Sequence, residues 1–76
     1  MPFNWKIYAK SLLKSEIARH DLNFIEVSER LKKIGVFETP QNLSNKIARG
    51  SFSATFMLQV LHVIGSNELH LEGMND

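Results

Sequence analysis

Apolar residues recur at three- and four-residue steps in four stretches of this chain, which predicts four amphipathic helices and almost no strand. The first stretch is expected to be helical from Asn4 or Trp5 to about His20. Its apolar stripe comprises Trp5, Tyr8, Ala9, Leu12, Leu13 and Ile17. Glu16 falls inside this stripe, where an unpaired carboxylate is costly. We therefore expect Glu16 to find a basic partner or to lie at the rim of the core.

The second helix has a marked start and a marked end. Asn23 can cap its first turn, and Glu26, three residues later, can reach back to complete a capping box. Gly35 is placed to end the helix. The face that we expect to be buried comprises Phe24, Val27, Leu31 and Ile34.

The third and fourth helices are also bounded by capping residues. Thr39 is a good N-cap, Pro40 suits the first helical position, and Gly50 suits the left-handed residue after the end. Ser53 can cap a fourth helix that runs to Gly65. Its apolar residues lie on most sides, so we expect it to be the central, buried helix: Phe56, Met57, Val60, Leu61 and Ile64. The sequence therefore predicts an all-α fold, a compact bundle of four or five helices.

Length and composition narrow the class of protein. The chain has 76 residues, of which 43% are hydrophobic and 22% are charged, as expected for one small globular domain. It has no cysteine, which excludes disulfides, cysteine-based zinc sites and thiol catalysis. No apolar run reaches the roughly 20 residues of a membrane span, and no signal-peptide cleavage site is visible. We expect a cytoplasmic protein that does not associate with membranes.

The net charge of +1 conceals an uneven distribution. Residues 1–65 hold nine Lys and Arg against five Asp and Glu, a net charge of +4, whereas residues 66–76 hold three carboxylates and no cation. We therefore separate a domain, 1–65, from an acidic tail, 66–76. The short alternation from Glu68 to Glu72 is typical of a strand used in self-association, but a frayed terminus is the favoured interpretation. A basic body permits a polyanionic partner and is equally compatible with ordinary surface charge.

The third helix carries the strongest functional signal. At about 100° per residue, Leu43 and Ile47 share one side of it. Polar and cationic residues, with no carboxylate among them, fall within about 140° on the other side: Gln41, Asn42, Asn45, Lys46 and Arg49. Asn and Gln match the edge of adenine, and Arg and Lys match guanine or phosphate. This face predicts contact with a DNA major groove, although a simply solvated face stays open as the alternative.

Other residues offer weaker candidates for chemistry. His20, His62 and His70 lack the spacing of a metal site, so we expect no metal and no other cofactor. Ser51 and Ser53 have no neighbouring base, and no small-molecule substrate is evident, so we do not expect an enzyme. Trp5, together with Phe3 and Tyr8, could stack on single-stranded bases, but anchoring of the first helix in the core is favoured.

The segments NFIEVSERL, NLSNKIARG and ATFMLQVLHVIG, in this order, resemble the helix-turn-helix of lambda-repressor-like (Cro/C1-type) DNA-binding domains. The resemblance covers about residues 5–65. It implies that the outward row of the third helix faces the groove, with Asn23 approaching the DNA backbone and Ser51 in a loop that often touches phosphate. The chain also resembles a short, functionally uncharacterised bacterial single-domain family with the core TxQN(L)xxK(I)xRGxFS(A), which implies a fold but no activity.

Three features depart from the lambda-repressor-like pattern. The connection KKIGVFE is several residues longer than the tight turn of that family. Ala48 stands where many members have a Glu that pairs with an Arg of the first helix, and Glu16 with a basic partner could replace that pair. The loop after Gly50 has no Lys or Arg, which should weaken binding to the DNA backbone.

Two hypotheses follow. The first is a small transcriptional regulator that binds double-stranded DNA sequence-specifically as a homodimer, with Lys6, Lys10 and Lys14 steering it to the backbone. The second is a protein-interaction module, antitoxin-like or antirepressor-like, that uses an apolar patch around Phe37, Phe52 and Phe56.

Overall fold

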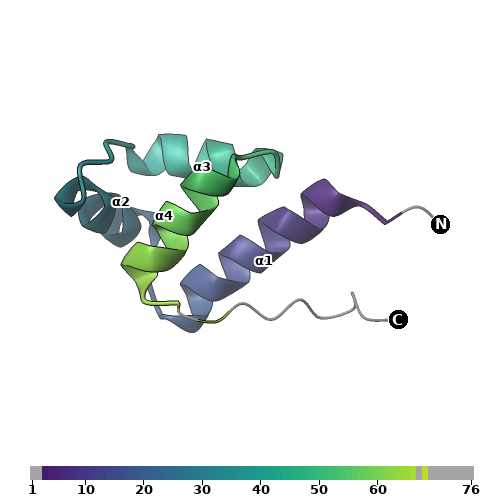
Figure 1. Ribbon diagram of the computed structural model, residues 1–76, viewed down its shortest axis with the longest axis horizontal. Coiled ribbons are helices and arrows are strands. Elements are labelled where there is room, and N and C mark those ends of the chain that lie inside the picture. Colours follow the sequence, from purple (N-terminus) through teal and green to yellow (C-terminus); the bar gives the residue numbers. More distant parts are fainter. Residues whose placement is uncertain (1–2, 67, 69–76) are drawn as a thin grey trace.

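Four α-helices make up the regular structure of the part of the chain that the computed structural model describes, residues 3–66 and 68. They are α1 (Trp5–Arg19), α2 (Phe24–Lys33), α3 (Pro40–Arg49) and α4 (Ala54–Ile64) (Figure 1). The predicted all-α, four-helix fold is confirmed. Of the alternation expected between 68 and 72, all but Glu68 lies outside the described residues. Within the described ranges, no helix has the length and apolar character needed to cross a membrane.

The helix ends follow the local chemistry that the sequence indicated. The Asn23 side chain accepts a hydrogen bond from the Glu26 backbone N–H at 2.9 Å, and the Glu26 carboxylate accepts one from the Asn23 N–H at 3.0 Å. Thr39 caps α3 by accepting from the Asn42 N–H at 3.1 Å, and Ser53 caps α4 in the same way. The predicted caps and the capping box are therefore confirmed, because each satisfies backbone N–H groups that a helix start leaves unpaired.

The core draws on all four helices. Ten hydrophobic side chains are buried: Leu13, Ile17, Val27, Leu31, Leu43, Ile47, Phe56, Val60, Leu61 and Ile64. Helix α2 packs against α3 and α4, and α1 packs against the same two helices. Helix α3 is therefore held along its inner side by α1 and α2, and its outer side is left open (Figure 1).

Two residues expected in the core lie outside it. Trp5 is 58% exposed and packs instead on Phe3, with ring centroids 4.6 Å apart. The buried positions of α1 begin at Leu13, so its first turns extend past the core. Ile34 is also exposed, because α2 has ended at Lys33 and Ile34 is its C-cap. The apolar pattern continued beyond the point where other helices could cover it.

Glu16 has the basic partner that the sequence predicted. Its side chain is buried, and its Oε1 accepts from the Arg19 guanidinium at 2.7 Å. Ser66, just beyond α4, donates its hydroxyl to the same oxygen. The hydrogen bonds from Arg19 and then Ser66 outweigh burial and lower the pKa of Glu16 from 4.5 to about 2. Because Glu16 and Arg19 belong to the same helix, their ion pair does not link α1 to α3 as the Glu–Arg pair of lambda-repressor-like domains would. The hydrogen bond from Ser66 to Glu16 instead ties the end of α4 to α1.

Candidate nucleic-acid interface

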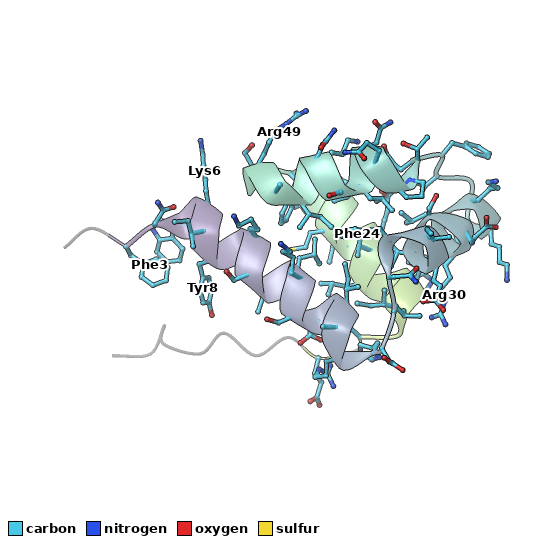
Figure 2. All side chains as sticks on the ribbon, turned by 180° about the vertical axis from the view of Figure 1, so that it is seen from behind. Phe3, Lys6, Tyr8, Phe24, Arg30 and Arg49 are labelled. Carbon is cyan, nitrogen blue, oxygen red and sulfur yellow. The ribbon has the colours of Figure 1, made fainter. Side chains whose placement is uncertain are left out.

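The outer side of α3 is a row of exposed amides on a firmly anchored helix. Leu43 and Ile47 are fully buried, whereas Gln41, Asn42 and Asn45 are exposed. The Gln41 side-chain N–H₂ donates to the Asn45 side-chain carbonyl at 3.2 Å, which links two amides one helical turn apart. The predicted two-sided character of this helix is confirmed. In Figure 2 the side chains of α3 extend from one edge of the molecule, with Arg49 among them.

Lys46 does not belong to this open row. Its ammonium forms an ion pair with the Glu38 carboxylate and lies 5.2 Å from the centre of the Phe56 ring. Glu38 lies in the connection that precedes α3, so its closeness to Lys46 depends on how that connection folds. The angular position of Lys46 places it with the amides, but its charge already has a partner within the protein.

Arg49, the last residue of α3, lies beside the first turn of α1. Gly50, which follows it, is buried with φ of +68°, and a Cβ atom there would lie 2.2 Å from the Lys6 carbonyl oxygen. Only glycine allows the two backbones to approach this closely. Figure 2 shows the Lys6 and Arg49 side chains extending toward the same edge of the molecule. Along the chain Lys6, Lys10 and Lys14 are equivalent candidates, because nothing local indicates which lysine meets α3.

Ser51 and Asn23, the two residues expected at the DNA backbone, lie in separate places. Ser51 is exposed and, with Arg49 and Ser53, lines a cavity of about 220 Å³ between the end of α3 and the start of α4. Asn23 lines a different cavity, of about 230 Å³, with Lys14. The carbonyl oxygen of the Asn23 side chain is occupied by the cap of α2, which leaves its N–H₂ group available.

The apolar patch proposed for protein binding does not form as expected. Phe56 is only 6% exposed and belongs to the core, and Phe52 is half-buried with its ring centre 5.8 Å from that of Phe56. Phe37 is 76% exposed and lies apart from them, where it lines a cavity of about 320 Å³ with Ile25 and Pro40. Closeness along the sequence suggested one patch of three phenylalanines. In the fold, Phe56 is in the core and Phe37 is on the surface.

Comparison with known protein families matches residues 5–69 to a family described as a domain of unknown function, DUF6471. The chain belongs to the DUF6471 family. The match begins at the first residue of α1 and extends past α4, so it covers all four helices. No curated protein and no solved structure matches this chain. Because the family description names no activity, the function of this DUF6471 domain has to be argued from its own residues.

The charge around α3 suits binding to an anionic partner. Helix α3 has no carboxylate, and the sequence has none from Thr39 to Gly65. Glu38, the nearest acidic residue before the helix, is paired with Lys46. The open surface of this DUF6471 domain therefore offers amide donors and acceptors from Gln41, Asn42 and Asn45 and cationic donors from Arg49 and Lys6, groups that bind and orient a partner.

Proposed function

We propose that this DUF6471 protein binds double-stranded DNA and reads its sequence with α3, as a small transcriptional regulator. One observation carries the proposal: the exposed side of α3 presents Gln41, Asn42, Asn45 and Arg49 without a carboxylate, while Leu43 and Ile47 fix the helix from behind. A ten-residue helix with such a surface suits a major groove, which is about 12 Å wide.

The amides of α3 have the donors and acceptors that base reading requires. The Asn45 carbonyl oxygen uses one lone pair for Gln41 and keeps the second, and its N–H₂ group is uncommitted among the described residues. Asn45 could therefore accept from adenine N6 and donate to N7 while Gln41 holds its orientation. Arg49 lies at the far end of the helix and suits guanine or phosphate. Lys46, already paired with Glu38, is left out of this row.

The packing of α2 against α3 supports the helix-turn-helix interpretation. The connection between them, residues 34–39, is longer than a tight turn but is held to α2, because the Ser28 hydroxyl donates to the Glu38 carbonyl at 2.6 Å. In this arrangement Asn23 and Ser51 would contact phosphates. A single α3 offers few base contacts, so we propose a homodimer on half-sites about 34 Å apart.

Replacing Asn45 with Ala tests base reading. On a duplex selected for tight binding, Asn45→Ala should lose about 1–3 kcal/mol of binding free energy, whereas its affinity for random duplex should not change. Fluorescence anisotropy with labelled duplexes measures both, and the stoichiometry gives the number of protomers per site. Ser11→Ala, which removes an exposed polar group from α1, is the control. Equal loss on both duplexes would contradict base reading, and no binding to any duplex at low salt would contradict the proposal itself.

A second candidate function, binding of another protein by an antitoxin-like or antirepressor-like module, is favoured by a different observation. Phe37 and Ile25 are 76% and 63% exposed and both line the 320 Å³ cavity, and the connection that carries Phe37 is fixed to α2 through Ser28. A large, exposed aromatic side chain on a fixed segment is well placed to anchor an interface with another protein.

The two candidate functions predict different effects of Phe37→Ser. If the protein binds DNA through α3, the affinity for duplex should change less than about twofold. If it is a protein-interaction module, duplex titration at low salt should show no salt-sensitive binding, and Phe37→Ser should abolish capture of a protein that the wild type retains. Ile7→Ser, which alters another exposed apolar residue on α1, is the matched control.

A further inference from the structure

The C-terminal end of α3 and the N-terminal end of α1 meet at Gly50. A Cβ atom at Gly50 would overlap the Lys6 carbonyl, so the two backbones are in direct contact there. Arg49 precedes this contact on one element, and Lys6 forms it on the other. Both side chains are exposed and extend toward the same edge of the molecule as the polar side of α3 (Figure 2).

Within the part of the chain that the structure describes, neither cation of this pair forms an ion pair. Glu16 pairs with Arg19 and Glu38 pairs with Lys46, so neither of these carboxylates neutralises Lys6 or Arg49. The first acidic residue of α1 is Glu16, ten positions after Lys6, and Arg49 lies within the acid-free stretch from Thr39 to Gly65. Because the backbone of Lys6 meets that of Gly50, the two segments that carry these cations are neighbours, and an anion that contacts both side chains reduces the repulsion between them.

Helix dipoles do not by themselves decide whether a phosphate binds here. The C-terminal end of α3 carries the negative end of its dipole, whereas the N-terminal end of α1, which meets it, carries the positive end of another. The side chains at this junction add two positive charges. Arg49 supplies a planar fork of donors and Lys6 a compact charge, and both groups bind phosphate oxygens.

We propose that Lys6 and Arg49 form a two-cation clamp on the phosphates of one DNA strand beside the groove that α3 enters. The inference rests on the proposed function and extends it, because it makes the first turn of α1 part of the DNA-binding surface and assigns Arg49 to the backbone rather than to a base. Gly50 is the positioning residue, since it alone lets α1 approach the end of α3 closely enough for both cations to reach the same strand.

Salt titrations of duplex binding between about 50 and 200 mM test the clamp. Each phosphate contact adds about 0.9 to the magnitude of the slope of log K against log salt. We expect Lys6→Gln and Arg49→Gln each to reduce that magnitude by about 0.9, equally on selected and random duplexes, and the double variant by about 1.8. Lys6→Arg should keep the wild-type slope, because phosphate requires only the charge. Lys33→Gln, at the C-terminal end of α2, controls for the loss of one charge from the whole protein.

The failure of the clamp differs from failure of the proposed function. If Lys6→Gln matches Lys33→Gln in slope while Asn45→Ala still loses site discrimination, the clamp is wrong and DNA reading by α3 stands. A slope that is also lost in Lys6→Arg would overturn the charge-based clamp. If the wild type shows no salt-sensitive binding to any duplex, both proposals are overturned. Lys6 and Arg49 are exposed, so we expect their variants to remain folded. Circular dichroism of each variant checks that altered binding does not reflect unfolding.

Discussion

The environments of two charged residues, Glu16 and Lys46, depend on their partners in the fold rather than on their positions along a helix. Glu16 lies on the apolar stripe of α1 and is stabilised there by Arg19 and Ser66. Lys46 lies on the polar side of α3, but Glu38 binds its ammonium. A charged side chain that is paired within the fold attracts a charged ligand less strongly, because its partner offsets its field. Arg49 and Lys6, which have no such partner among the described residues, keep theirs.

The Glu16 contacts predict a pH dependence of stability. The folded state holds the pKa of Glu16 at about 2, below its ordinary value of 4.5, so the carboxylate is favoured in the folded protein. This stabilisation is therefore fully present above about pH 4.5 and is lost as the pH falls toward 2. Glu16→Gln should lower the free energy of unfolding by roughly 1 kcal/mol at pH 7, after allowance for solvent screening. Urea denaturation of wild type and variant at pH 7 and near pH 2 measures the effect.

The difference in the free energy of unfolding between wild type and Glu16→Gln should shrink toward zero near pH 2. At that pH the Glu16 carboxylate of the wild type becomes protonated and loses its charge. Glu29→Gln, which alters an exposed carboxylate on α2, should change stability by less than about 0.5 kcal/mol at either pH. A constant deficit of Glu16→Gln from pH 7 to pH 2 would show that packing, rather than charge, is what the substitution removes.

At the scale of elements, the position of α3 depends on how its ends are held. Thr39 and Pro40 fix the start, and Gly50 ends the helix against α1. Gly35, after α2, and Gly65, after α4, also adopt positive φ, but a Cβ atom at either would lie in open space. The three glycines therefore share one local role, and only Gly50 has a tertiary one.

The substitution Gly50→Ala should separate these two roles. Gly35→Ala should cost roughly 1–2 kcal/mol of stability, since it forces a Cβ into the left-handed region and nothing more. Gly50→Ala should cost about 3 kcal/mol or more, because the Lys6 backbone must also move away. Thermal and urea unfolding of the two variants give the comparison. Equal costs would show that α1 yields easily, and the close approach would then not constrain the position of Lys6.

Across the molecule as a whole, exposed apolar residues border the polar side of α3. The labelled Arg49 and Lys6 extend toward one edge (Figure 2), and two groups of exposed aromatic and aliphatic residues lie beside the ends of the proposed surface. Phe37 and Ile25 border the cavity beside α2, and Phe3 packs on Trp5 and Tyr8 at the start of α1. The surface that we assign to DNA therefore has exposed aromatic side chains beside it, because Asn42 lines the cavity that Phe37 borders and Trp5 precedes Lys6 in α1.

Much of the fold could be read along the chain, because the signals for it are local. The caps at Asn23, Thr39 and Ser53 involve residues three apart, and the burial of Leu43 and Ile47 follows from helical spacing. The amide row of the site was predictable for the same reason, since residues on one side of a helix share it whatever surrounds the helix. The exposure of Trp5 was not, because it depends on where α1 extends beyond its neighbours.

Local signals along the chain specify the four helices, their ends and the side of α3 that carries Gln41, Asn42 and Asn45, since each depends on residues within about one turn. Three other features depend on how the helices pack: Lys46 is paired with Glu38, Phe37 is exposed while Phe56 is buried, and the backbone of Lys6 meets that of Gly50. These outcomes depend on segments 8 to 44 residues apart along the chain. Whether such segments meet is set by how the buried faces of all four helices pack together, and no single stretch of residues contains that information.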